Sequence, residues 1–84
     1  MFHKNYVYAH VDEFCSPLYI GVGVYGRAWE QKKRDSFHLK WLEEQSHNYV
    51  EIWNSGLSFD QAIILERGYI REYDPKFNIQ ERLK

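Results

Sequence analysis

Cysteine is nearly absent from this chain of 84 residues, because Cys15 is its only one. A single thiol excludes an internal disulfide and offers no cluster of thiolate ligands, so a small secreted disulfide scaffold is not expected. Long apolar runs are also missing: none approaches the ~20 residues of a membrane-spanning helix, and the N-terminus lacks the apolar core of a signal peptide. We therefore expect a cytoplasmic protein that does not act at a membrane.

An excess of one charge is missing as well. The formal net charge is -1, which provides no overall attraction for nucleic acid. Any binding of that kind must come from a local patch, and Lys32, Lys33 and Arg34 form one candidate. A run of three cations is also typical of a solvated helix face. The histidines are scattered without the spacing of metal ligands.

Aromatic side chains are abundant: they make up 18% of the residues and include seven tyrosines. Tyrosine combines an apolar ring with a hydroxyl group, so some of these residues can serve polar roles. The length of the chain is suited to one domain, residues 1–84, with a single modest core.

Three segments have the composition of β-strands. Residues 5–11 and 18–24 are rich in aromatic and β-branched side chains and are separated by turn-forming residues, which predicts an antiparallel hairpin. In that hairpin Tyr8 and Tyr19 would lie on neighbouring strands. Residues 49–53 are predicted to form a third strand, which ends where the turn-forming residues 54–56 begin.

Two helices are predicted between and after these strands. Residues 27–44 have helical spacing, with an irregularity near Asp35. Their expected buried stripe comprises Trp29, Phe37, Trp41 and Leu42. Ser58 and Gln61 form a capping-box pattern that starts the second helix, which is expected to continue through Tyr73 until an Asp-Pro pair ends it. The remaining residues would fray or form a short helix.

The stretch from Tyr19 to Arg27 contains Gly21, Gly23 and Gly26. Glycines leave a strand with little side-chain cover, so another backbone or a phosphate could approach it closely. The guanidinium of Arg27 at the end of this stretch is suited to a phosphate or a carboxylate. An isolated arginine after a glycine is otherwise a surface cation.

Glu66 falls on the apolar stripe predicted for the second helix. That stripe comprises Phe59, Ala62, Ile63, Tyr69, Ile70 and Tyr73, and Glu66 lies three or four residues from the middle four of them. An unpaired buried carboxylate is costly, so Glu66 should meet an arginine, a lysine or a metal ion. A structural ion pair and a metal site would both meet this requirement.

Five landmarks occur in a fixed order along the chain. They are Tyr6-Val7-Tyr8, Tyr19-Ile20-Gly21, Gly26-Arg27-Ala28, Glu66 and, twelve residues later, Asn78. Together they resemble the GIY-YIG nuclease family, and the resemblance covers residues 6–78. It implies a small mixed α/β fold, a three-stranded antiparallel sheet flanked by helices in the order β-β-α-β-α.

The resemblance also implies a role for each landmark. Tyr8 would act as the general base or help to activate the attacking water, and Tyr19 would orient that water or the phosphate. Arg27 would neutralise the scissile phosphate. Glu66 would be the sole protein ligand of a divalent metal, Mg²⁺ or Mn²⁺, and Asn78 would support the site.

The chain departs from the family pattern at three positions. Tyr6 replaces the glycine of the first motif, Val22 stands where many relatives have lysine, and Gln31 stands where many have histidine or tyrosine. With Gln31 unable to relay a proton, His38 becomes the candidate for that role, unless it is a hydrogen-bonded structural histidine. Residues 32–34, which follow Arg27, become candidate phosphate contacts, and Gly21 and Gly23 would leave room for the DNA backbone.

The function implied by this resemblance is metal-dependent hydrolysis of DNA phosphodiester bonds by an endonuclease. One active site cuts one strand, so double-strand cleavage would need a second copy of the chain or two sequential nicks. Sequence specificity would be low, arise from dimerisation or depend on a separate partner. The alternative is a non-catalytic nucleic-acid-binding module that has kept the fold. Such a module would have no need for the buried Glu66.

Overall fold

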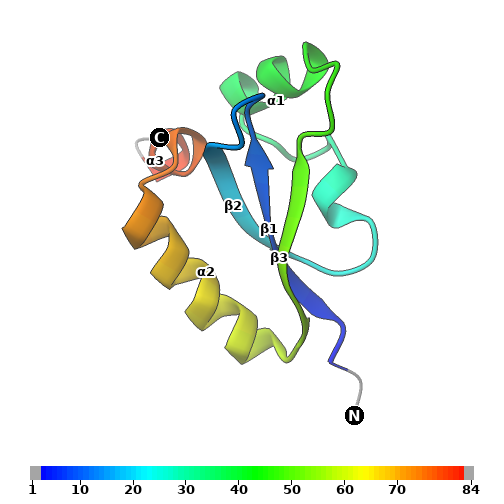
Figure 1. Cartoon of the computed structure of the whole chain (residues 1–84), viewed down its shortest axis with the longest axis vertical. Coiled ribbons are helices and arrows are strands. Elements are labelled where there is room, and N and C mark those ends of the chain that lie inside the picture. The colour runs from blue at the N-terminus through cyan, green and yellow to red at the C-terminus, as the bar shows by residue number, and fades with distance from the viewer. Residues whose placement is uncertain (1–2, 83–84) are drawn as a thin grey trace.

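The structure is a computed structural model that describes residues 3–82, with side chains described through residue 79 (Figure 1). Its elements in chain order are β1 (Asn5–Val11), β2 (Pro17–Gly23), the 3-10 helix η1 (Arg27–Trp29), α1 (Ser36–Glu43), β3 (Val50–Leu57), α2 (Phe59–Tyr73) and α3 (Lys76–Arg82). The predicted fold class is confirmed: a three-stranded antiparallel sheet is flanked by helices. The predicted tail extends to Lys84, and its last two residues lie outside the described part. Within residues 3–82, no helix is both long and apolar enough to cross a membrane.

The sheet has the order β2-β1-β3, so β1 is central and both of its neighbours are antiparallel to it. Tyr8 of β1 pairs with Gly21 on one side and Ile52 on the other. Because side chains alternate across a strand, β1 presents aliphatic residues on one face and aromatic or polar residues on the other. The predicted hairpin of the first two strands is confirmed, and Tyr8 and Tyr19 lie on neighbouring strands.

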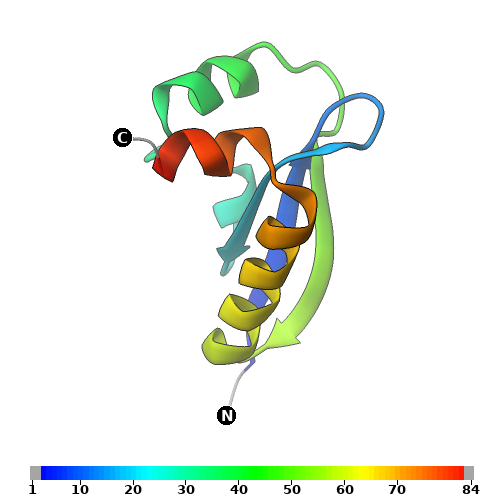
Figure 2. The same cartoon turned by 90° about the vertical axis from the view of Figure 1, so that its left-hand side faces the viewer.

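The aliphatic face packs against α2. Its buried core comprises Val7, Ala9, Val11, Ile20 and Ala62. Figure 2 shows α2 running along this face of the sheet, with α3 crossing near the end of α2. Burial of such side chains contributes roughly 1.5–3 kcal/mol for each large aliphatic residue, so this face supplies a major part of the stability.

The other face of β1 carries Tyr6, Tyr8 and His10, and it holds the segment between β2 and α1. The Tyr6 hydroxyl accepts a hydrogen bond from the Ala28 backbone N–H (3.0 Å) and donates one to the Tyr25 carbonyl (2.7 Å). His10 Nε2 lies 2.7 Å from the Ala28 carbonyl oxygen. These alternate residues of one strand therefore anchor the turn that carries Arg27.

The helix predicted over residues 27–44 is wrong in its first part, whereas the irregularity predicted near Asp35 is confirmed, because α1 begins there. The chain forms only the short η1, then turns through Lys33, whose φ of 59° is left-handed, before α1 begins. Asp35 caps α1 by accepting a hydrogen bond from the Phe37 N–H. Left-handed backbone is incompatible with a continuous right-handed helix, so the apolar stripe is broken as well. Phe37 is 63% exposed and Trp29 is 54% exposed rather than buried, whereas Leu42 is in the core.

The third strand is longer than predicted, because it continues through Asn54 and ends at Leu57. The turn-forming residues are absorbed within the strand, where Gly56 has a φ of 67° and the pairing with β1 shifts its register. The helix start is confirmed: Ser58 Oγ accepts from the Gln61 N–H, and Gln61 Oε1 accepts from the Ser58 N–H. The end of α2 at Tyr73 is also as predicted. Phe59 and Tyr73, which were predicted on the buried face of this helix, are instead 60% and 47% exposed.

On the aromatic face of the sheet, Gly21 and Gly23 of β2 are covered by side chains. Gly21 and Gly23 are buried, and the rings of Tyr8 and Tyr6 fill the space above them. An aromatic ring that covers a cross-strand glycine shields backbone that would otherwise be exposed. On this face of the sheet the rings therefore occupy the space that the two glycines were predicted to leave for a DNA backbone. Gly23 also lines a separate hollow together with Arg27, so its predicted contact with DNA stays a prediction.

Adding a methyl group at Gly21 is expected to destabilise the fold. A Cβ there would lie 2.7 Å from the Tyr8 hydroxyl oxygen and 2.9 Å from Cε2 of Tyr19, so two packed rings must move. We expect Gly21→Ala to lower the free energy of unfolding by about 1–3 kcal/mol, measured by urea denaturation. Gly68→Ala is the matched control, because a Cβ at Gly68 meets nothing within 4 Å and alanine favours the helix. Equal stability of Gly21→Ala and the unmodified chain would show that the rings do not fill this space.

Candidate functional site

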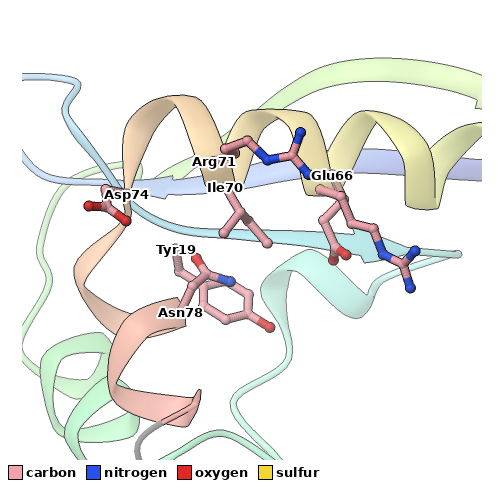
Figure 3. Close-up of a pocket in the computed structure, with 7 residues that line it drawn as sticks. Tyr19, Glu66, Ile70, Arg71, Asp74 and Asn78 are labelled. Carbon is pink, nitrogen blue, oxygen red and sulfur yellow. The ribbon is translucent and has the colours of Figure 1, made fainter.

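An open cavity of about 610 Å³ lies beside β2, where α2 and α3 approach that strand (Figure 3). It is lined by Tyr19, Glu66, Arg67, Ile70, Arg71, Asp74 and Asn78. Three of these residues were predicted as site residues, and they come from β2, α2 and α3 respectively. Figure 3 shows the Glu66 carboxylate extending from α2 toward the side on which the Tyr19 hydroxyl lies. We call this cavity the Glu66 pocket.

Asn78 fastens α3 to the edge of the sheet. Its Oδ1 accepts a hydrogen bond from the Ile20 N–H (2.8 Å), and its Nδ2 donates one to the Ile20 carbonyl (2.9 Å). One side-chain amide thus pairs with the backbone of β2 as a further strand would. Asn78 is buried, so these backbone groups depend on it for hydrogen bonds. Because Tyr19 immediately precedes Ile20, Asn78 fixes the backbone that carries the tyrosine.

The Tyr19 ring is half-buried in a group of aromatic side chains. Its centroid lies 6.1 Å from that of Tyr8, 5.7 Å from that of His10 and 4.4 Å from that of His38. The Arg34 guanidinium carbon lies 5.5 Å from the centre of the Tyr19 ring. These contacts hold the ring in place while Tyr19 still lines the Glu66 pocket.

Glu66 is half-buried and lines the pocket rather than being enclosed in the core. Among the described side chains, no group of three or more His, Cys, Asp or Glu residues is arranged to hold a metal ion. Asp74 lines the same pocket but follows Glu66 by two helical turns, about 12 Å along the axis, so one ion cannot bind both. A single carboxylate in a roomy pocket fits Mg²⁺, which keeps several waters and takes substrate phosphate oxygens as ligands.

Arg27 does not line the Glu66 pocket. Together with Glu30, Gln31, Lys32 and Lys33 it lines a separate hollow. Its Nη1 donates to the Lys32 carbonyl (2.9 Å) and lies 3.5 Å from the Glu30 carboxylate. The Arg27 side chain is 28% exposed, and the two lysines are exposed. This hollow therefore collects three cations on the loop that follows β2.

Arg34 is buried, and its prediction as a phosphate contact is wrong. Its guanidinium donates to the Tyr8 hydroxyl (2.7 Å), the Arg27 carbonyl (2.8 Å) and the Glu30 carbonyl (3.0 Å). The left-handed turn at Lys33 directs the chain so that Arg34 points inward while its two lysine neighbours stay exposed. Arg34 therefore secures the Arg27 loop against β1.

Tyr8 is buried at 1% exposure, and its hydroxyl accepts the hydrogen bond from Arg34. Burial raises the pKa of Tyr8 above its usual value, and the opposing charges of Arg34 and Arg27 do not cancel this effect. A general base at this atom would need the phenolate, which a raised pKa disfavours at neutral pH. The geometry argues against Tyr8 as the base and gives it a part in positioning the Arg27 loop and Tyr19.

His38 is fully buried and pairs with His10, which agrees with the alternative of a hydrogen-bonded structural histidine and argues against the predicted proton relay. His38 Nε2 lies 2.8 Å from His10 Nδ1, and His10 Nε2 faces the Ala28 carbonyl. Since a carbonyl only accepts, we assign the His10 proton to Nε2, which leaves Nδ1 to accept from His38. Burial lowers the pKa of His10 to about 4 and that of His38 to about 3, so both rings are neutral at pH 7.

Comparisons with known proteins do not identify a family. No protein-family model matches the chain, and no curated protein matches it significantly. The resemblance to GIY-YIG nucleases therefore stays a prediction from the five sequence landmarks.

The structure brings together three predicted residues, Tyr19, Glu66 and Asn78, and places Arg27 in a separate hollow. His10 was not singled out from the sequence, although its alternation with Tyr8 on β1 was a usable signal for a shared face. The position of Arg67 beside Glu66 was also missed, because a charged residue on the exposed side of a helix is ordinarily a solvated one.

Proposed function

We propose that this chain is a metal-dependent endonuclease that hydrolyses DNA phosphodiester bonds at the Glu66 pocket. One observation carries the proposal: Tyr19, Glu66 and Asn78, selected from the sequence for this chemistry, line one open cavity although they lie far apart in the chain. An open cavity beside a sheet edge also suits an extended polyanion better than an enclosed small molecule.

Glu66 is the residue that would hold the divalent metal, Mg²⁺ or Mn²⁺. When bound, the ion neutralises charge on the phosphoryl group and assists the departing oxygen. A single carboxylate binds such an ion weakly by itself, so substrate phosphate completes the site. Metal and DNA are therefore expected to bind cooperatively.

Tyr19 is the phenol that reaches the pocket, and its hydroxyl can orient the attacking water or a phosphate oxygen by a hydrogen bond. Tyr8 and His38 would support the Tyr19 ring, because their rings contact it from the buried side. Neither is exposed to the reacting groups. Their effect on the reaction would come through the position of Tyr19.

Arg27 would neutralise charge on the substrate phosphate. Its present partners, the Lys32 carbonyl and the Glu30 carboxylate, belong to its own loop and are partly exposed, so these contacts are weak and easily exchanged for a phosphate. Lys32 and Lys33 would extend the contact to the DNA backbone on this side. A guanidinium also binds a phosphate with two parallel hydrogen bonds, which its present contacts do not provide.

A plasmid-nicking assay tests the proposal. The intact chain is expected to convert supercoiled DNA to the open circle with Mg²⁺ and not with EDTA, on duplex, branched or single-stranded substrates. We expect Arg27→Ala to slow the reaction by about 10²-fold, because it removes one preorganised charge at the phosphate. Lys40→Gln, which removes an exposed cation on α1, is the control and should leave the rate unchanged. Binding without any cleavage by the intact chain would contradict the enzyme proposal.

A non-catalytic nucleic-acid-binding module is the second candidate. One observation favours it: Arg27 and Glu66 line different hollows, whereas an active site would need both groups at the same phosphate. In that case the basic loop would bind nucleic acid and the Glu66 pocket would have no reaction to perform. The same assay separates the two candidates, because only the enzyme requires Mg²⁺ to change the DNA.

A further inference from the structure

Two arginines of α2, Arg67 and Arg71, line the Glu66 pocket, and the landmark residues account for neither of them. They are four residues apart, so they lie on the same side of the helix, about 6 Å apart along its axis. Both side chains are exposed. Figure 3 shows Arg71 extending from α2 next to Glu66.

Neither arginine is bound to another group in the part of the chain that the structure describes. Within the side chains of residues 3–79, Arg67 and Arg71 form no hydrogen bond and no ion pair, whereas Arg27 and Arg34 both do. Two like charges at this spacing destabilise an isolated helix. The pair is therefore unfavourable for α2 alone, and both guanidinium groups keep their donors available for a ligand.

The chemistry of the pair points to phosphate. A guanidinium offers a planar fork of donors that matches a phosphate, and its charge is present at every pH of interest. The chain as a whole carries a formal charge of -1, so attraction for a polyanion must be local. Arg67 and Arg71 provide such a local charge immediately beside the residue proposed to hold the metal.

We propose that Arg67 and Arg71 bind backbone phosphates of the nucleic-acid strand next to the phosphate that is cleaved at Glu66. The strand would then follow α2 toward Asp74, whose carboxylate lines the far part of the pocket and would repel a further phosphate. The inference rests on the proposed nuclease function and adds the path of the substrate along α2. The lysines of the Arg27 hollow would contact the nucleic acid on the other side of β2.

The salt dependence of DNA binding tests this inference without any cleavage. Affinity of the full chain for a fluorescent duplex oligonucleotide is measured by anisotropy in EDTA at several NaCl concentrations. In a plot of log K for binding against log salt concentration, each contact to a backbone phosphate adds about 0.9 to the magnitude of the slope. We expect Arg67→Gln and Arg71→Gln each to reduce the magnitude of the slope by about one and to weaken binding at low salt. Arg67→Lys should restore most of the slope because it keeps the charge.

Lys40→Gln is the matched control, since it removes one exposed cation of α1 that lies outside the pocket, and its slope should equal that of the intact chain. If Arg67→Gln and Arg71→Gln keep the full slope, the inference is overturned even if the intact chain nicks DNA. If both variants lose slope while the intact chain never nicks DNA, the phosphate contacts stand and the nuclease proposal fails. If the intact chain does not bind DNA at all, both proposals are overturned. Far-ultraviolet circular dichroism of each variant shows whether the fold is retained.

Discussion

Glu66→Gln is expected to abolish Mg²⁺-dependent nicking while the fold and DNA binding persist. Glutamine keeps the size of the side chain but removes the negative charge that a hard divalent cation requires. Loss of the metal removes stabilisation of charge on the phosphoryl group, and we expect the nicking rate to fall by at least about 10²–10³-fold. The measurement is the initial rate of plasmid nicking at saturating Mg²⁺.

Asp74→Asn provides the matched control for this prediction. Asp74 lines the same pocket, and its replacement by asparagine removes the same charge as Glu66→Gln. It lies two helical turns from Glu66, however. We therefore expect a rate close to that of the intact chain. Equal nicking by Glu66→Gln and the intact chain would show that Glu66 does not hold the metal.

The buried histidine pair is expected to make the fold unstable in mild acid. Burial lowers the pKa of His10 from 6.5 to about 4 and that of His38 to about 3, the latter with a further contribution from the charge of His10. Between these pKa values and pH 6.5, the unfolded chain therefore binds more protons than the folded chain. The free energy of unfolding consequently falls as the pH falls through this range. Two such groups would together remove about 3 kcal/mol of unfolding free energy between pH 6.5 and pH 5. That is a large part of the stability of a small domain.

Urea denaturation at a series of pH values measures this loss. His38→Gln removes one titrating group while keeping a polar side chain in the cluster, so we expect a smaller pH dependence than that of the intact chain. The range above pH 5 separates the histidines from most carboxylates, whose usual pKa values are lower. A stability that is flat between pH 7 and pH 5 would contradict the assignment of a neutral, buried pair.

Local sequence signals predicted the fold where one pattern determined one element. The alternation from Tyr6 to Val11 defined β1, and the hydrogen-bonding pair of Ser58 and Gln61 defined the start of α2. An irregularity near Asp35 was predicted, but the left-handed turn at Lys33 was not, because a lysine with left-handed backbone carries no local signature. The contacts that stabilise that turn, from Arg34 to Tyr8, join residues 26 positions apart.

The site was predictable to the extent that its residues form a recognisable ordered set. Tyr19, Glu66 and Asn78 line one pocket, whereas Tyr8 and Arg27, which the resemblance placed with them, do not line it. The burial of Arg34 and His38 was not predictable, because both depend on partners that other elements bring to them. Spacing along the chain also gave no reason to separate Arg27 from Glu66. That separation comes from β2, which has α2 on one face and the Arg27 loop on the other.

The proposal that the Glu66 pocket binds a divalent metal together with DNA is tested most directly by paramagnetic broadening of backbone amide signals. Mn²⁺ is titrated into isotopically labelled protein in the presence of an oligonucleotide that resists cleavage. We expect the earliest loss of signal at the amides of Tyr19, Glu66 and Asn78, with much less loss in Glu66→Gln. Broadening centred on another acidic stretch, such as Glu43 and Glu44, or the same pattern in Glu66→Gln, would contradict the proposal.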